Sequence, residues 1–151
     1  MGLIGAWLGS LYFGAPLYIM SPLTFLARPQ SWLWAIHRYR GTISAAPNFA
    51  FELCLDKIEE TALAGLNLSS LRLVANGAEP VSIPTLRRFT ERFGAYGLRP
   101  GTVAPVYGLA ENAVAVTLPK PGEPPLIDRI DRNALGRGGI AQPTEIGRAH
   151  V

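Results

Sequence analysis

The sequence predicts a layered α/β fold with a largely parallel sheet and flanking helices. Short, continuously apolar segments such as 71–75 and 102–106 alternate with longer amphipathic segments such as 29–40. This alternation is typical of parallel strands joined by helices. The 16 Gly and 13 Pro residues follow no repeat and indicate many tight turns between short elements. With 151 residues, of which 48% are hydrophobic, the chain has the size of one domain with a buried core.

The first 27 residues contain no charged side chain, a length sufficient for a membrane-spanning helix. Gly5, Gly9, Gly14 and two prolines interrupt this stretch, so we expect a buried core helix followed by a short strand over residues 16–20. No cationic residue precedes the apolar run, which argues against a signal peptide. We therefore expect no stable membrane insertion; a small membrane protein anchored by residues 1–27 is the alternative.

The middle of the chain alternates between helix and strand signals. Residues 29–40 begin near a proline, and Arg38 and Arg40 complement the helix dipole at the other end. Ser82 is a typical N-cap residue, and the loop before it breaks the preceding strand. The predicted elements are, in order, helix 29–40, strand 42–45, helix 47–60, strand 71–75, helix 82–93, strand 102–106 and strand 113–118.

The character of the chain changes after residue 118. Residues 119–139 are rich in Pro, Gly and charge, which predicts a surface segment outside the core. Residues 140–151 are left unassigned. Residues 146–151, IGRAHV, resemble a sequencing adapter translated in one frame and are excluded from the fold prediction.

Charge and cysteine usage exclude several functions. The net charge is +3 and no run of Lys and Arg forms a stripe, so nucleic acid is not an expected partner. Cys54 is the single cysteine, which fits a reducing, cytoplasmic compartment and a small core residue. His37 is expected to be partly exposed on its helix. Arg87, Arg88 and Arg92 are expected to form a solvated helix face.

Two loops carry the features that point to a ligand. The sequences NGAEP (76–80) and YGLAE (107–111) each follow an apolar strand, and in a parallel sheet both emerge at the carboxyl edge, where ligands bind. Each loop contains a glycine, which lets the backbone approach a ligand closely, and one carboxylate. Glu111 could hold a metal ion carried by polyphosphate, because Mg²⁺ prefers oxygen ligands. Alternatively, Glu79 and Glu111 merely cap helices.

An adenine ring requires an aromatic or peptide plane and backbone hydrogen bonds, which Tyr107, Gly77 and Ala78 could supply. These features favour a nucleotide site. The sequence contains no GxSxG, HExxH, CxxC or Walker-type motif, so it gives no sign of the enzymes that these motifs mark.

Several longer stretches together resemble a known family. They are MGLIG (1–5), SPLTFLARPQSWLWAIHRYRGTISAAPNFAFELC (21–54), LNLSSLR (66–72), NGAEPV (76–81) and YGLAE (107–111). In content, order and spacing the chain resembles the adenylate-forming superfamily, and most closely its fatty acyl-AMP ligases. The resemblance implies that residues 1–118 are part of the AMP-binding core of the large N-terminal domain. It also implies that residues 119–139 begin an insertion specific to acyl-AMP ligases.

The resemblance also implies roles for individual residues. Glu111 matches a glutamate that helps hold magnesium during catalysis. Tyr107 matches a tyrosine that packs on adenine, and Ala110 stands where relatives often have Thr or Ser. The positions implied to bind ATP or AMP are Gly77, Ala78, Glu79, Pro80, Tyr107, Gly108, Leu109 and Ala110.

The chemistry implied is activation of a fatty acid by ATP to an acyl-adenylate, followed by transfer to the thiol of an acyl carrier protein or polyketide synthase carrier domain. Phe49, Phe51 and the first helix would wall the acyl tunnel. The phosphate-binding loop and the C-terminal catalytic domain of the family have no match in the chain, so we expect the 151 residues to be an inactive part of the parent enzyme. The alternatives are an acyl-coenzyme A synthetase of the same superfamily, with coenzyme A as acceptor, and a non-catalytic nucleotide-binding or interaction module.

Overall fold

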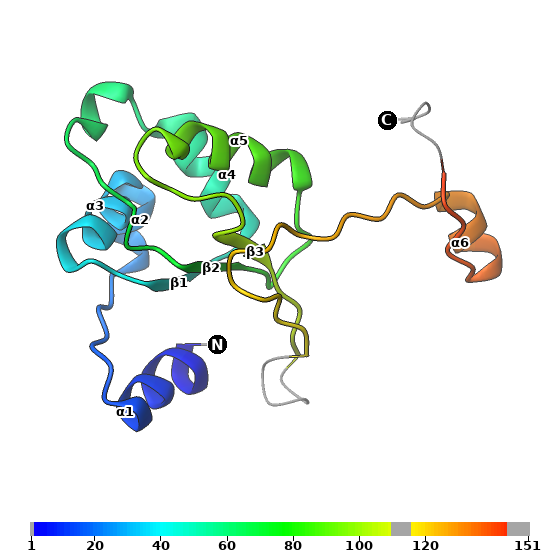
Figure 1. Ribbon diagram of the computed structural model, residues 1–151, viewed down its shortest axis with the longest axis horizontal. Helices are drawn as coiled ribbons and strands as arrows, with labels where there is room; N and C mark the ends of the chain where they lie inside the picture. The colour runs from blue at the N-terminus through cyan, green and yellow to red at the C-terminus, as the bar shows by residue number, and fades with distance from the viewer. Residues whose placement is uncertain (1, 110–115, 145–151) are drawn as a thin grey trace.

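The computed structural model describes residues 2–109 and 116–144, and its centre is a small parallel sheet. The three strands are β1 (Ile43–Ala46), β2 (Leu73–Asn76) and β3 (Val103–Pro105), in the order β1-β2-β3 (Figure 1). Both strand pairs are parallel, with Asn76 aligned with Ala46 on one side and with Pro105 on the other. The predicted α/β class is confirmed.

Two helices connect the strands and cover one face of the sheet. Helix α4 (Asn48–Lys57) follows β1 and helix α5 (Ile83–Gly94) follows β2; they pack against each other above the sheet in Figure 1. The Phe51 and Phe89 rings meet edge to face, with centroids 4.9 Å apart, at the centre of the core. Burial of such aromatic rings is the main source of core stability.

Local sequence determines where these helices begin. Ser82 has an extended backbone and its side chain accepts a hydrogen bond from the Thr85 N–H at 3.4 Å, so the predicted N-cap of α5 is confirmed. Helix α3 (Gln30–Tyr39) buries Leu33 and Ile36 and ends at Arg40, whose φ of 49° is left-handed. His37 is partly exposed on α3, as predicted.

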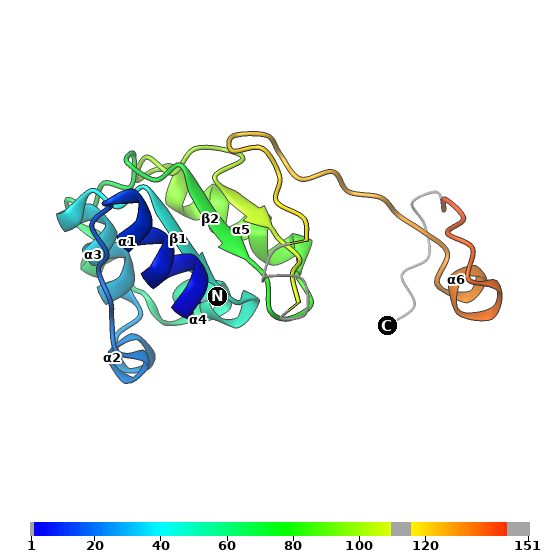
Figure 2. The same cartoon turned by 90° about the horizontal axis from the view of Figure 1, so that it is seen from below.

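The first residues form helices, but these are not buried. They comprise η1, a π-helix (Gly2–Leu8), α1 (Gly9–Phe13) and α2 (Pro22–Ala27), of which the sequence did not predict α2. Figures 1 and 2 show α1 on the side of the sheet that α4 and α5 leave open, separated from β1. Among the described helices none is long and apolar enough to cross a membrane. The expectation of a core helix is wrong because, within the described chain, no element packs over this one.

Residues 16–20 do not form the predicted buried strand. They are irregular, and Ile19 is 82% exposed. A strand needs a neighbour for its backbone N–H and C=O groups, and the described residues place none beside this segment. Tyr18 instead stacks on Tyr39 of α3, with ring centroids 3.9 Å apart, so an aromatic contact holds the segment.

The predicted strand 113–118 is not part of the sheet in the residues that can be described. Residues 113–115 lie outside them, and Thr117 forms only an isolated antiparallel bridge with Tyr107. Apolar composition predicted a strand here, and among the described residues the segment pairs with the turn after β3 rather than with a strand of the sheet. Strand and helix ends elsewhere differ from prediction by one to three residues: Asn76 belongs to β2, and α4 ends at Lys57.

Residues 119–144 are largely exposed and lead away from the sheet to α6 (Arg132–Gly138) in both views (Figures 1 and 2). The surface location is as predicted, whereas the helix was not predicted. Asp131 caps α6 by accepting a 2.8 Å hydrogen bond from the Ala134 N–H. The Asp131 N–H in turn donates to the Gln142 carbonyl, which closes the segment on itself.

Arg92 was expected on a solvated face, and this expectation is wrong. Its guanidinium donates to the carbonyl oxygens of Cys54, Leu55 and Ile58 at the end of α4, the Leu55 bond measuring 2.7 Å. Carbonyl groups in the last turn of a helix generally lack partners within the helix, and a cationic side chain can donate hydrogen bonds to them. Its charge also interacts favourably with the negative end of the helix dipole. Arg88 does lie at the surface, 3.3 Å from Glu52.

Arg92→Leu is expected to lower the free energy of unfolding by about 1–3 kcal/mol, because it removes the side-chain donor of the Leu55 and Ile58 carbonyls. Urea denaturation followed by tryptophan fluorescence measures this change. Arg87→Ala, at an exposed position of the same helix, is the control and should change the free energy by less than about 0.5 kcal/mol. Equal effects of the two substitutions would contradict the capping role.

Cys54 lies in the core with no exposed surface, as predicted. Burial raises the pKa of its thiol from 9.0 to about 12, against a smaller lowering by the Arg92 charge. Because the thiolate is the reactive form, Cys54 of the native protein should resist thiol reagents at pH near 8 and react on unfolding in denaturant. Rapid native labelling, followed by absorbance of the released thiophenolate, would show that α4 and α5 open readily.

Candidate functional site

The two loops singled out in the sequence begin side by side at the carboxyl edge of the sheet. The register pairs Asn76 at the end of β2 with Pro105 at the end of β3. The Val106 N–H then donates to the Asn76 carbonyl at 2.8 Å, which holds the two chain segments together one residue beyond the ladder. Ligands in open parallel sheets bind at this edge.

Gly77 is the point of closest approach between the loops. It is buried, and a Cβ at this position would lie 2.6 Å from the carbonyl oxygen of Val106 and 2.9 Å from its Cγ2. Distances this short exclude any side chain unless the backbone moves. The glycine is therefore required by its contact with Val106, and this contact holds the starts of the two loops next to each other.

Ala78 has a φ of 70°, one of the two left-handed non-glycine residues among those described. Left-handed backbone costs an L-residue with a Cβ roughly 1–2 kcal/mol. Ala78 and Pro80 are exposed, so the backbone of this turn is accessible at the edge of the sheet. Strained backbone of this kind clusters at ligand sites.

Glu79 serves as a helix-capping residue. Its Oε1 accepts a 2.6 Å hydrogen bond from the Phe49 N–H in the first turn of α4. That N–H has no partner within the helix, and a carboxylate there also complements the helix dipole. Of the two roles considered for this carboxylate, the structure supports capping, which connects the Gly77 loop to α4.

Tyr107 presents its side chain at the same edge. It is 61% exposed. Its backbone N–H donates to the Thr117 carbonyl, and its carbonyl accepts from the N–H groups of Val116 and Thr117. The ring is thus available to a planar ligand on a fixed main chain. Gly108 is exposed and Leu109 is partly buried.

Ala110 and Glu111 lie outside the described residues, so their predicted roles stay predictions. Within residues 2–109 and 116–144, no three His, Cys, Asp or Glu side chains gather in a way that would hold a metal ion.

Two asparagines belong to the site and were not predicted. Asn48, which starts α4, accepts hydrogen bonds at Oδ1 from the Ser82 N–H at 3.0 Å and from Asn76 Nδ2 at 3.3 Å. The sequence did contain an indication of Asn48, because Pro47-Asn48 directly follows a predicted strand, as the other two loops do. All three strands therefore contribute to the site at one edge.

An apolar hollow of about 200 Å³ lies next to this edge. Phe49, which is 50% exposed, lines it and contacts the Glu79 carboxylate through its N–H. Phe51, predicted with Phe49 to wall an acyl tunnel, does not line this hollow, because its ring is fully buried against Trp32 and Phe89. The other residues that line the hollow are Met20, Ser21, Pro22, Phe25, Trp32, Ala45, Ala46, Pro47 and Ala50.

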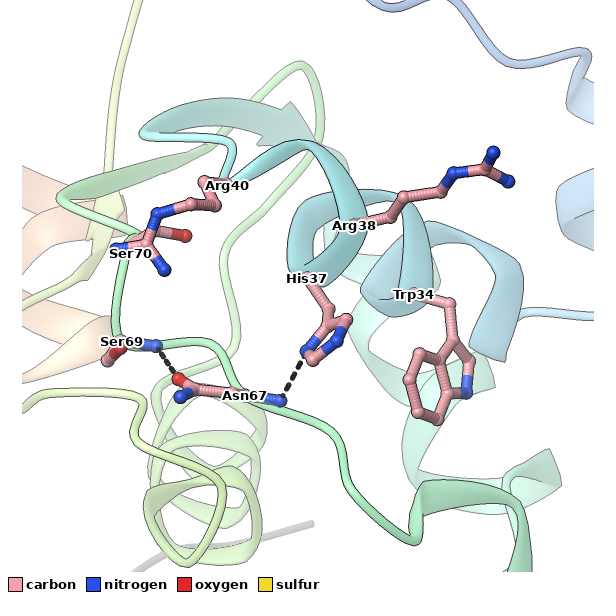
Figure 3. A pocket seen from close by; sticks show the side chains of 7 residues that line it. All are labelled: Trp34, His37, Arg38, Arg40, Asn67, Ser69 and Ser70. Atoms are coloured by element: carbon pink, nitrogen blue, oxygen red, sulfur yellow. Dashed lines mark hydrogen bonds between the residues drawn. The ribbon is translucent and has the colours of Figure 1, made fainter.

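A second hollow, of about 560 Å³, lies at the opposite, amino edge of the sheet. Figure 3 shows His37 Nδ1 accepting from the Asn67 N–H at 3.0 Å, while Asn67 Oδ1 accepts from the Ser69 N–H. Arg40 extends toward Ser70, and Arg38 points away from His37. None of the predicted site residues lines this hollow, so it is separate from the candidate nucleotide site.

Comparison with known proteins gives consistent matches. The family model described as AMP-binding enzyme matches residues 1–138. A probable long-chain-fatty-acid–AMP ligase of Mycobacterium tuberculosis is 38% identical over 138 residues, 91% of this chain and 24% of the relative. A medium-chain-fatty-acid–[acyl-carrier-protein] ligase of Moorena producens is 42% identical over 139 residues, 92% of this chain and 24% of the relative.

Solved structures of fatty acyl-adenylate ligases also resemble this chain. A chain from a study of fatty acyl-adenylate ligases of E. coli and L. pneumophila superposes with a TM-score of 0.91 at 37% identity, covering 99% of this chain and 27% of that one. The L. pneumophila ligase in complex with acyl adenylate and pyrophosphate gives a TM-score of 0.79 at 44% identity, over 82% of this chain and 22% of that one. The chain thus spans about a quarter of the length of the curated relatives it matches.

Proposed function

The chain belongs to the AMP-binding enzyme family, and on that premise we propose that it is part of a ligase that activates a fatty acid with ATP. The products are an acyl-adenylate and pyrophosphate, and the acyl group then passes to a carrier-protein thiol with release of AMP. The chain supplies part of the large AMP-binding domain through residues 1–118. Such an enzyme would act in the cytoplasm, where ATP is available and the single free Cys54 stays reduced.

The observation that carries this proposal is the contact between the two loops at Gly77 and Val106. Gly77 is followed by the exposed, left-handed Ala78, and Val106 is followed by Tyr107, whose ring is exposed. An adenine ring can pack on Tyr107 and meet backbone groups of residues 77–80, while Gly108 and Leu109 continue the same wall. Ala110, which lacks a hydroxyl, makes no side-chain hydrogen bond to phosphate.

In the first step a carboxylate oxygen of the fatty acid attacks the α-phosphorus of ATP. A new O–P bond forms, the bond to the β-phosphate bridging oxygen breaks, and pyrophosphate leaves. The nucleophile is already an anion, so no general base is required. Such chemistry depends on positioning and charge neutralisation. Magnesium, when bound, neutralises charge on the phosphates, and Glu111 is the residue proposed to hold it.

The apolar hollow beside Phe49 suits an acyl chain. It borders the nucleotide edge through the hydrogen bond between the Phe49 N–H and Glu79. The carboxylate of a fatty acid held there would lie toward the loops. An aliphatic chain gains stability from removal of apolar surface from water. Relatives with fatty-acid names are 38–42% identical to this chain over 138–139 residues.

For the acyl acceptor we propose the pantetheine thiol of an acyl carrier protein or a polyketide synthase carrier domain. Similarity to a ligase named for acyl-carrier-protein acylation supports this choice. The exposed segment 119–139, with α6, is proposed to begin the insertion associated with that preference. An acyl-coenzyme A synthetase of the same superfamily is the competing assignment.

The test uses the protein encoded by the whole open reading frame that contains this sequence, hereafter the complete enzyme. With ATP, Mg²⁺ and a fatty acid, it should release pyrophosphate and accumulate acyl-adenylate. Addition of a holo-carrier protein should yield an acylated carrier, whereas free coenzyme A should not yield a thioester. Failure to form acyl-adenylate from fatty acids of any chain length would refute the activity, and thioester formation with free coenzyme A would favour the competing assignment.

A further inference from the structure

Asn76 is a buried amide at the end of β2, one residue before the Gly77 loop. Its exposed fraction is 0%, and its backbone carbonyl accepts the Val106 N–H at 2.8 Å. Its side chain reaches the start of α4, where Nδ2 donates to Asn48 Oδ1 at 3.3 Å. One residue thus connects the ends of all three strands.

The orientation of both amides follows from a single donor. The Ser82 backbone N–H can only donate, so the Asn48 atom 3.0 Å away must be the oxygen. Because this oxygen is an acceptor, the Asn76 atom that contacts it must be the Nδ2 group. Asn76 Oδ1 is therefore directed to neither partner. It is the buried side-chain polar atom that has no hydrogen-bond partner within the described residues.

An unpaired buried acceptor is unfavourable for folding, and each such group in a native structure requires an explanation. Leucine has the same branched shape as asparagine and would fill this space without an unpaired oxygen. Stability alone therefore does not account for an amide at Asn76. What the amide provides is the hydrogen bond to Asn48.

That bond belongs to a set of contacts that hold the Gly77 loop at both ends. At its start, Asn76 is bonded to Asn48; beyond its end, the Ser82 N–H is bonded to the same oxygen. Between them, Glu79 is bonded to the Phe49 N–H. The loop that carries the left-handed Ala78 is thus fastened to the first turn of α4 at three points.

We propose that Asn76 is a positioning residue of the nucleotide site, acting through Asn48 to hold the Gly77 loop in the geometry that receives the adenosine part of ATP. This inference rests on the proposed function, because it assigns Asn76 a role in the same nucleotide site. Asn76 itself does not touch the nucleotide. Its loss should weaken ATP binding and leave fatty-acid binding unchanged.

The test measures KM for ATP, KM for the fatty acid and the melting temperature of the complete enzyme with Asn76→Leu and Asn76→Asp. Asn76→Leu keeps the shape and removes the unpaired oxygen, so the melting temperature should stay or rise while KM for ATP increases about tenfold, the effect of one lost hydrogen bond. Asn76→Asp places a carboxylate against Asn48 Oδ1 and should raise KM for ATP at least as much. KM for the fatty acid should change less than about twofold in both, because Asn76 does not line the apolar hollow.

Asn67→Ala is the control for the Asn48 variants, since the Asn67 side chain, like that of Asn48, accepts a backbone N–H but lies at the amino edge of the sheet. It should leave KM for ATP unchanged. Asn48 provides a second, independent pair of variants: Asn48→Asp keeps an oxygen for both donors, whereas Asn48→Ala removes it. KM for ATP should therefore be near the wild-type value in Asn48→Asp and about tenfold higher in Asn48→Ala.

A KM for ATP within twofold of wild type in Asn76→Leu would overturn the inference, as would equal increases of both KM values with a lower melting temperature. If the Asn76 variants do not fold, the two Asn48 variants decide, and equal KM values for ATP in them would overturn it. Absence of acyl-adenylate formation by the wild-type enzyme would instead refute the proposed function, so the two failures are distinguishable.

Discussion

Gly77→Ala in the complete enzyme is expected to lower the free energy of unfolding by about 1–3 kcal/mol, the usual cost of forcing an extra methyl into a packed contact. The added Cβ would lie 2.6 Å from the Val106 carbonyl oxygen; the Cβ position is fixed by the main chain and the oxygen belongs to it, so no side-chain rotation can relieve the contact. The loops after β2 and β3 must separate. Because a displacement of about 1 Å can cost on the order of 10²-fold in rate, acyl-adenylate formation should fall by about that factor.

Gly94→Ala is the control for this substitution. Gly94 ends α5, and a Cβ there would meet nothing within 4 Å. Alanine has higher helix propensity than glycine, so Gly94→Ala should be neutral or stabilising by up to about 1 kcal/mol. Urea denaturation and pyrophosphate release measure the two effects. An active Gly77→Ala enzyme of unchanged stability would mean that the two loops do not meet in the working enzyme.

Glu111→Gln is expected to lower the rate of acyl-adenylate formation by on the order of 10²-fold or more and to raise the Mg²⁺ concentration required for half-maximal rate. The physical reason is that an amide oxygen lacks the charge with which a carboxylate holds a hard divalent cation. A Mg²⁺ titration of pyrophosphate release at saturating ATP measures both changes. This prediction depends on the proposed function, since Glu111 lies outside the described residues.

Two other glutamates provide contrasts for Glu111→Gln. Glu79→Gln keeps an oxygen for the Phe49 N–H, so its Mg²⁺ dependence should match that of the wild type even if the loop is weakened. Glu91 is exposed on α5, and Glu91→Gln should change neither parameter. A shift in Mg²⁺ dependence for Glu79→Gln but not for Glu111→Gln would show that Glu79 of the Gly77 loop, and not Glu111, holds the metal ion.

Much of the fold follows from local sequence. The apolar runs predicted β1, β2 and β3 to within a few residues, and Ser82 marked the start of α5, because strand burial and N-capping are determined by neighbouring residues. The pairing of the two loops was also predictable. Parallel strands that alternate with helices must deliver their following loops to the same edge.

The first helix and residues 16–20 show where local reasoning fails. Apolar composition indicates that a segment will be buried, but it does not identify what will bury it. In the described chain α1 remains exposed and residues 16–20 have no neighbouring strand. A side chain is buried only when a second surface contacts it, and the sequence of the segment does not specify that second surface.

The roles of Arg92, Asn48 and Asn76 were decided by tertiary structure alone. The sequence around Arg92 predicts a solvated cation, and only the fold shows that the end of α4 lies beside it. The hydrogen bond between Asn48 and Asn76 joins residues that are 28 positions apart in the sequence. By itself the sequence determined the α/β class, the order of β1, α4, β2, α5 and β3, and the delivery of two loops to the same edge of the sheet, because these depend on periodicity and on the direction of strands. Only the folded chain decided which polar groups meet, because a hydrogen bond requires two atoms to come within about 3 Å and sequence spacing does not specify that distance.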